Sequence, residues 1–108
     1  MSLPVVLRRA AQAEFDEASD WYEHRQPGRG GKFTTAVGST FATIAAAPEA
    51  FTEVYTDVRE APVARYPFAV YYRVNAAQIT VVAVFHTSRD LGVWQARVGQ
   101  PNRFDSAP

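Results

Sequence analysis

Residues 68–85 read FAVYYRVNAAQITVVAVF, and this stretch decides the class of fold. Over residues 68–74, aromatic and β-branched side chains alternate with other residues, which is typical of a β-strand. Because neighbours in a strand face opposite ways, we expect one of Tyr71 and Tyr72 in the core and the other at the surface. In residues 79–85, both the odd and the even positions are apolar, so both faces of this strand carry apolar side chains. We therefore expect the strand to be covered on both faces or to lie centrally in the sheet. The tight turn between the two strands predicts an antiparallel pair.

Two amphipathic helices are predicted before these strands. In residues 9–25, apolar side chains recur every three or four positions, and five of the remaining positions are acidic. We expect Trp21 and Tyr22, near the end of this helix, to lie mostly in the core. A second helix is expected over residues 33–47, ended by Pro48, and the short loop between the two helices gives an antiparallel helical hairpin. Gly38, within the second helix, costs about 1 kcal/mol relative to Ala, which is reasonable if another helix approaches closely there.

The full order of elements predicts an α+β fold. A first strand is expected at residues 3–7, a strand limited by its proline to an edge or a bulge at 58–65, and a short helical candidate at 90–97. We therefore predict the order βααβββ, with the helical hairpin packed on a mostly antiparallel four-stranded sheet and a short C-terminal helix or tail. Residues 1–98 are expected to form a single domain, and residues 99–108 a loosely ordered tail.

The composition excludes several classes of protein and site. The chain has 108 residues, enough for one domain with its own core. It has no cysteine, which excludes a disulfide framework, a cysteine-based zinc site and a thiol nucleophile. Its two histidines leave little for a metal centre, and we expect neither a metal nor a cofactor. No apolar run approaches the ~20 residues of a membrane span and no secretory signal is recognisable, so we expect a soluble, cytoplasmic protein without a membrane partner.

Charge is balanced overall but unevenly distributed along the chain. Residues 1–57 hold five basic and eight acidic side chains, whereas residues 58–108 hold six basic and three acidic ones. Ten of the eleven basic residues are Arg, whose planar fork suits carboxylates and phosphates. The second half of the chain therefore predicts an acidic partner, and a solvated basic face is the alternative.

Short runs of sequence from about residue 3 to residue 97 resemble one family. They are WYE at 21–23, PGRG at 27–30, RYPFAVYY at 65–72 and VFHTSRD at 84–90, followed by Trp94 and Arg97. Together they resemble the RelE/ParE toxin superfamily of type II toxin–antitoxin modules, and most of all its ParE branch, the plasmid-stabilisation proteins. The resemblance implies the same βααβββ fold and a small cytoplasmic toxin that a cognate, ParD-like antitoxin neutralises.

The superfamily contains two modes of action. RelE-like members cleave mRNA on the ribosome, whereas ParE-like members are described as inhibitors of DNA gyrase. RelE-type nucleases carry an Arg early in the strand that matches residues 68–74, where this chain has Ala69, and a second basic residue near the position of Thr87. Many also use a Tyr or an acidic residue late in the chain, and no Tyr follows Tyr72 here. We therefore favour a toxin that binds a target such as DNA gyrase and performs no chemistry of its own.

Two alternatives remain open. One is a ribosome-dependent, metal-independent endoribonuclease in which His86 acts as general acid or base and Arg65, Arg73 and Arg89 hold the phosphate. His86 could instead cap the last strand, bonded to the backbone or to Asp90. The other alternative is a degenerate, non-toxic member that serves only as a binding module.

The residues expected to contact the target or the antitoxin lie in the second half of the chain: Arg59, Arg65, Arg73, Arg89, Trp94 and Arg97. A structural role is the alternative for two of them. Arg59, beside Asp57 and Glu60, could form a fold-stabilising ion pair, and Trp94 could anchor the last helix through apolar packing. Direct specific binding to DNA is not expected, because the net charge is zero and no helix is a basic recognition helix.

Overall fold

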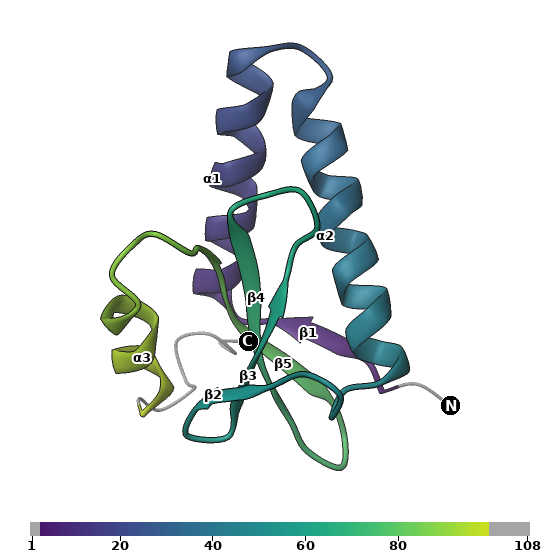
Figure 1. The fold of residues 1–108 in the computed structure, drawn as a ribbon, viewed down its shortest axis with the longest axis vertical. Coiled ribbons are helices and arrows are strands. Elements are labelled where there is room, and N and C mark those ends of the chain that lie inside the picture. Colours follow the sequence, from purple (N-terminus) through teal and green to yellow (C-terminus); the bar gives the residue numbers. More distant parts are fainter. Residues whose placement is uncertain (1–2, 100–108) are drawn as a thin grey trace.

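A computed structural model describes residues 3–99 of the chain (Figure 1). Its elements follow in the order β1 (Val5–Leu7), α1 (Arg9–Arg25), α2 (Arg29–Ala46), β2 (Glu53–Tyr55), β3 (Val58–Pro62), β4 (Phe68–Val74), β5 (Ile79–His86) and α3 (Gly92–Val98). The strand order in the sheet is β1-β5-β4-β3-β2. β1 is parallel to β5, and the other neighbouring strands are antiparallel. The tail predicted for residues 99–108 lies, apart from Gly99, outside the described residues.

The α+β class is confirmed, but the sheet has five strands and not four. The additional strand is β2, whose three residues are all exposed, so it lacks the alternation of buried and exposed side chains that reveals a strand. β3 ends at Pro62 and not at Arg65, because Arg65 adopts a positive φ of 73° in the turn to β4. α2 begins at Arg29, earlier than predicted, because the two glycines that favour a loop are helical here.

A carboxylate and a glycine hold the two helices together at the tip of the hairpin. Glu23 accepts hydrogen bonds from the backbone N–H groups of Gly28 (3.1 Å) and Gly30 (3.0 Å). These N–H groups lie at the start of α2, where backbone donors have no acceptor within the helix itself. A Cβ atom at residue 30 would lie 2.8 Å from the carbonyl oxygen of Ser19, so α1 and α2 can approach this closely only where residue 30 is Gly. The prediction of a close approach at Gly38 was wrong, since a Cβ atom there would meet nothing within 4 Å.

Both faces of the sheet are covered. The α1–α2 hairpin packs on one face, where Phe33 of α2 and Tyr72 of β4 belong to one buried cluster. α3 packs on the other face, where Trp94 and Tyr71 belong to a second buried cluster. Tyr71 and Tyr72 are both fully buried, so the expectation that one of them lies at the surface was wrong. The reason is α3, which covers the face that would otherwise be open.

Candidate functional site

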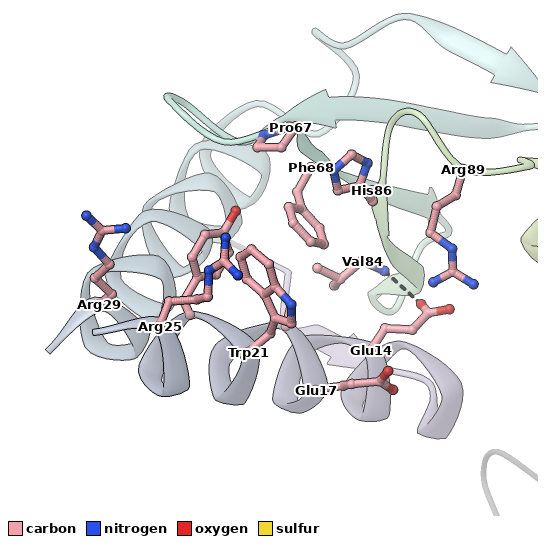
Figure 2. Close-up of a pocket in the computed structure, with 12 residues that line it drawn as sticks. Glu14, Glu17, Trp21, Arg25, Arg29, Pro67, Phe68, Val84, His86 and Arg89 are labelled. Atoms are coloured by element: carbon pink, nitrogen blue, oxygen red, sulfur yellow. Dashed lines mark hydrogen bonds between the residues drawn. The ribbon is translucent and has the colours of Figure 1, made fainter. Parts of the chain in front are cut away.

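A pocket of about 460 Å³ lies between α1 and the adjoining ends of β4 and β5 (Figure 2). Its walls are formed by Glu14, Glu17, Ala18, Trp21, Tyr22, Arg25, Arg29, Pro67, Phe68, Val84, His86 and Arg89. α1 can supply one whole wall because the helical hairpin extends well beyond the ends of the strands (Figure 1). The pocket thus offers apolar surface and charges of both signs within one concavity.

Trp21 contributes an exposed aromatic ring to the apolar surface of the pocket. The residue is 54% exposed, so the prediction that it lies mostly in the core was wrong. The core position at this level of α1 belongs to Tyr22, which stacks on Phe33 with ring centroids 5.0 Å apart and meets Tyr66 at 5.2 Å. Burial raises the pKa of Tyr22, and its proximity to Tyr66 raises it further. Trp21 precedes Tyr22 by one residue, so its side chain points about 100° away from that of Tyr22 around the helix axis. Trp21 therefore faces the pocket and not the core.

Two Arg side chains at the pocket are stacked on aromatic rings. The guanidinium carbon of Arg25 lies 4.6 Å from the centroid of the Trp21 ring, one helical turn away on α1. That of Arg89 lies 4.7 Å from the centroid of the Phe85 ring. A guanidinium held against a ring loses less conformational freedom when it binds a carboxylate, because its donors are already arranged. The pocket therefore has two preorganised groups for an acidic partner.

His86 lines the same pocket and contacts neighbours of its own. Its ring meets Phe68 edge to face, with centroids 5.1 Å apart. Nδ1 accepts a hydrogen bond from the backbone N–H of Ser88 at 3.2 Å and lies 2.8 Å from the Ser88 hydroxyl oxygen. In the neutral ring this bond assigns the proton to Nε2, which leaves that nitrogen as a donor. The expectation that His86 bonds to the backbone near the end of the last strand agrees with this contact.

Glu14 closes the end of the pocket against the open edge of β5. β1 covers β5 only from Ile79 to Val81, so the rest of that edge has no neighbouring strand within the described residues. One Glu14 oxygen accepts the backbone N–H of Val84 at 3.1 Å, and the other pairs with Arg97 at 3.0 Å. Arg97 also donates to the carbonyl of Val82 at 3.1 Å. Two paired side chains thus occupy backbone groups that another strand would otherwise use.

The structure separates the four predicted catalytic candidates. His86 and Arg89 line one pocket on the α1 side of the sheet. Arg73 lies with α3 on the opposite side, where it pairs with Asp57 at 2.8 Å and donates to the Val98 carbonyl at 3.4 Å. Arg65, in the turn between β3 and β4, lines a different and larger hollow beside α2. These four residues therefore do not form one constellation.

Three further residues with a predicted binding role make contacts within the chain. Arg59 donates to the carbonyl oxygens of Phe51 (2.6 Å) and Glu49 (3.2 Å), so within residues 3–99 it is carbonyls and not carboxylates that hold it. Trp94 is fully buried and anchors α3, as the structural alternative proposed. Arg97 is occupied by its bonds to α1 and β5, and its side chain is 17% exposed.

Sequence reasoning did not assign Trp21, Arg25 and Arg29 to a site. The signal that was present is the spacing of Trp21 and Arg25, four residues apart, which places an aromatic ring and a cation side by side on one helix face. Among residues 3–99, no three His, Cys, Asp or Glu side chains are grouped so that they could hold a metal ion. None of the helices in that range is long and apolar enough to cross a membrane.

Comparison with known proteins gives a consistent result. The family model described as the ParE toxin of the type II toxin–antitoxin system parDE matches residues 5–91. A solved structure described as the chromosomal ParDE toxin–antitoxin system from P. aeruginosa is similar to this chain with a TM-score of 0.70 and 20% sequence identity. The match covers 81% of this chain and 98% of that one, and it shows a shared fold. No curated protein matches the chain.

Proposed function

The chain belongs to the ParE toxin family of type II toxin–antitoxin systems, and from this membership we propose that it arrests growth by binding DNA gyrase and is neutralised by a ParD-like antitoxin. In this proposal the toxin works in the cytoplasm and stabilises or blocks one state of the enzyme–DNA complex. It breaks no bond of its own and needs no cofactor.

The observation that carries the binding mechanism is the separation of the cationic side chains. Stabilising the transition state of RNA cleavage requires donors that converge at about 2.7–3.1 Å on one developing charge. Arg73 and Arg65 lie away from His86, and the guanidinium groups of Arg25 and Arg89 rest on two different rings. This arrangement suits contacts spread over a protein surface better than a single reacting centre.

One observation favours the second candidate, a metal-independent endoribonuclease. The pocket brings His86 together with Glu14, Glu17 and Arg89, which is the kind of set that acid–base cleavage of RNA uses. Against this, Glu14 is already bound by Val84 and Arg97, and Nδ1 of His86 by Ser88. The binding mechanism therefore remains the better supported of the two.

A supercoiling assay with purified gyrase tests the proposal. We expect the wild-type toxin and His86→Ala to inhibit supercoiling alike, and added antitoxin to restore it. Full supercoiling in the presence of a toxin that still arrests growth would refute gyrase as the target. Primer extension on translated mRNA tests the alternative, which requires new 5′ ends that disappear with His86→Ala. Induced expression without growth arrest in the source organism would instead indicate a non-toxic binding module.

A further inference from the structure

We propose that the pocket beside Trp21 is the antitoxin's anchoring site, and that it takes one large apolar side chain of an acidic segment by insertion rather than by strand addition. The inference rests on the proposed function, since it assumes an antitoxin. It goes further because it names the surface, the chemistry of the segment and the mode of contact.

The apolar part of the argument is the exposure of Trp21. Exposed tryptophans in concave surfaces are typical of the few residues that dominate binding energy. Among the large hydrophobic residues exposed in residues 3–99, Trp21 is the largest. Its ring meets Tyr22 edge to face, with centroids 5.0 Å apart, and carries the Arg25 guanidinium described above. Phe68 and Val84 extend its apolar surface inward. A volume of about 460 Å³ lies within the range of pockets that hold a single small ligand, so one large side chain can enter.

The charges select an acidic segment. Three Arg and two Glu line the pocket, but Glu14 is already neutralised by Arg97, which reaches it from α3. This leaves Arg25, Arg29 and Arg89 against Glu17. Carboxylates beside the inserted side chain would meet guanidinium groups that two aromatic rings hold in place, and such charge-assisted bonds are about twice as strong as neutral ones. The apolar wall disfavours a nucleic acid backbone, which has no large apolar group to place there.

The edge of β5 determines the mode of contact. A peptide that added a strand here would need the Val84 N–H and the Val82 carbonyl, and Glu14 and Arg97 already bind both groups. These two side chains are less than one-fifth exposed and pair with each other at 3.0 Å. Displacing them would leave a carboxylate and a guanidinium without partners in a partly buried place, which is unfavourable. The segment is therefore held by its side chains.

Calorimetric titration of the full-length toxin with the antitoxin encoded beside it tests the site. We expect Trp21→Ala to raise the dissociation constant at least ~30-fold, as for a binding hot spot. Arg25→Glu should raise the dissociation constant about 10-fold at low salt, with a smaller effect at high salt. The matched controls are Val93→Ala, exposed on α3, and Arg9→Glu, exposed at the start of α1. Both controls should bind like the wild type, and circular dichroism should show that all four variants fold.

Tryptophan fluorescence gives a second readout. The chain has two tryptophans, and Trp94 is fully buried, so a blue shift on binding reports on Trp21. We expect the shift in the wild type and its absence in Trp21→Phe, which should still bind.

The outcomes separate this inference from the proposed function. If the wild-type toxin does not bind the antitoxin, the proposed function fails. If Trp21→Ala and Arg25→Glu bind as tightly as the two controls, the antitoxin is confirmed as a partner but this site is refuted. A blue shift produced by a DNA or RNA oligonucleotide, and not by the antitoxin, would assign the pocket to nucleic acid and would also overturn the inference.

Discussion

The Tyr71 ring stacks on the Trp94 indole with centroids 4.4 Å apart and an angle of 28° between the ring planes. Both side chains are fully buried, and the Tyr71 hydroxyl donates to a Glu60 carboxylate oxygen at 2.6 Å. The stack joins α3, which is only seven residues long, to the second face of the sheet. A helix this short has little stability of its own, so its position depends on this contact.

Trp94→Ala should therefore detach α3 and destabilise the whole domain. Replacing a fully buried Trp by Ala costs about 3–5 kcal/mol through lost burial and the cavity that remains. Urea unfolding, followed by circular dichroism, measures the loss. Val93→Ala on the exposed side of the same helix is the control, and it should change the free energy of unfolding by less than about 0.5 kcal/mol. Equal effects of the two substitutions would contradict the packing described here.

Stability should fall at alkaline pH, and Tyr71 should contribute to the fall. Burial raises the pKa of Tyr71, and the hydrogen bond to Glu60 raises it further. The folded chain then holds this proton more tightly than the unfolded chain, whose tyrosines titrate near pH 10. Stability from this group is complete below about pH 10 and declines above it, by up to about 1.4 kcal/mol per pH unit. Urea unfolding at pH 9, 10 and 11 should show a shallower decline for Tyr71→Phe, and parallel declines would contradict the assignment.

Two glycines of α2 should respond to substitution in opposite directions. Gly30→Ala places a methyl group 2.8 Å from the Ser19 carbonyl oxygen, so the hairpin must open and the domain should lose about 1–3 kcal/mol. Gly38→Ala enters open space within the helix and should stabilise the domain by about 0.5–1 kcal/mol. Thermal melting of both variants measures the difference. Destabilisation of similar size at both positions would show that the close approach is misplaced.

The pair of Glu14 and Arg97 should behave as one unit in a double-mutant cycle. Glu14→Gln or Arg97→Met alone leaves a partly buried charge without its partner and should cost about 2–3 kcal/mol. The double variant should cost less than the sum of the two single variants, with a coupling of about 1–2 kcal/mol. Urea unfolding of the four proteins gives the cycle, and strictly additive losses would argue against a direct interaction.

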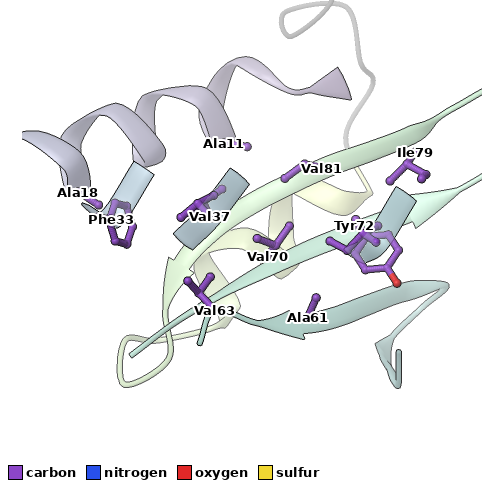
Figure 3. Close-up of a cluster of buried hydrophobic side chains, with 12 residues drawn as sticks. Ala11, Ala18, Phe33, Val37, Ala61, Val63, Val70, Tyr72, Ile79 and Val81 are labelled. Atoms are coloured by element: carbon purple, nitrogen blue, oxygen red, sulfur yellow. The ribbon is translucent and has the colours of Figure 1, made fainter. Parts of the chain in front are cut away.

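Most of the fold could be predicted from the sequence, because its longer elements bury regular patterns. Phe33 and Val37 follow the helical spacing and lie together in the core, where β4 contributes Val70 and Tyr72 (Figure 3). β2 could not be predicted, since all three of its residues are exposed and only its pairing with β3 defines it.

The candidate site was predictable only in part. His86 and Arg89 follow the last strand and were identified from their chemistry. Trp21 flanks the apolar face of the first helix, and the sequence pattern therefore predicts a core position for it. Its exposure depends on how far α1 extends beyond the sheet, which no local pattern encodes. Glu14 can bind the Val84 N–H only because β1 pairs with β5 no further than Val81, and no local pattern encodes that end point either.

The parallel pairing of β1 with β5 has a consequence for how the protein is made. Val5 and its partner Ile79 are separated by more than seventy residues of chain. The helical hairpin and the later strands can assemble from segments that are near in sequence, but β1 has no partner until β5 is in place. Closing so long a loop is slow, and completion of the sheet should therefore be a late event in folding.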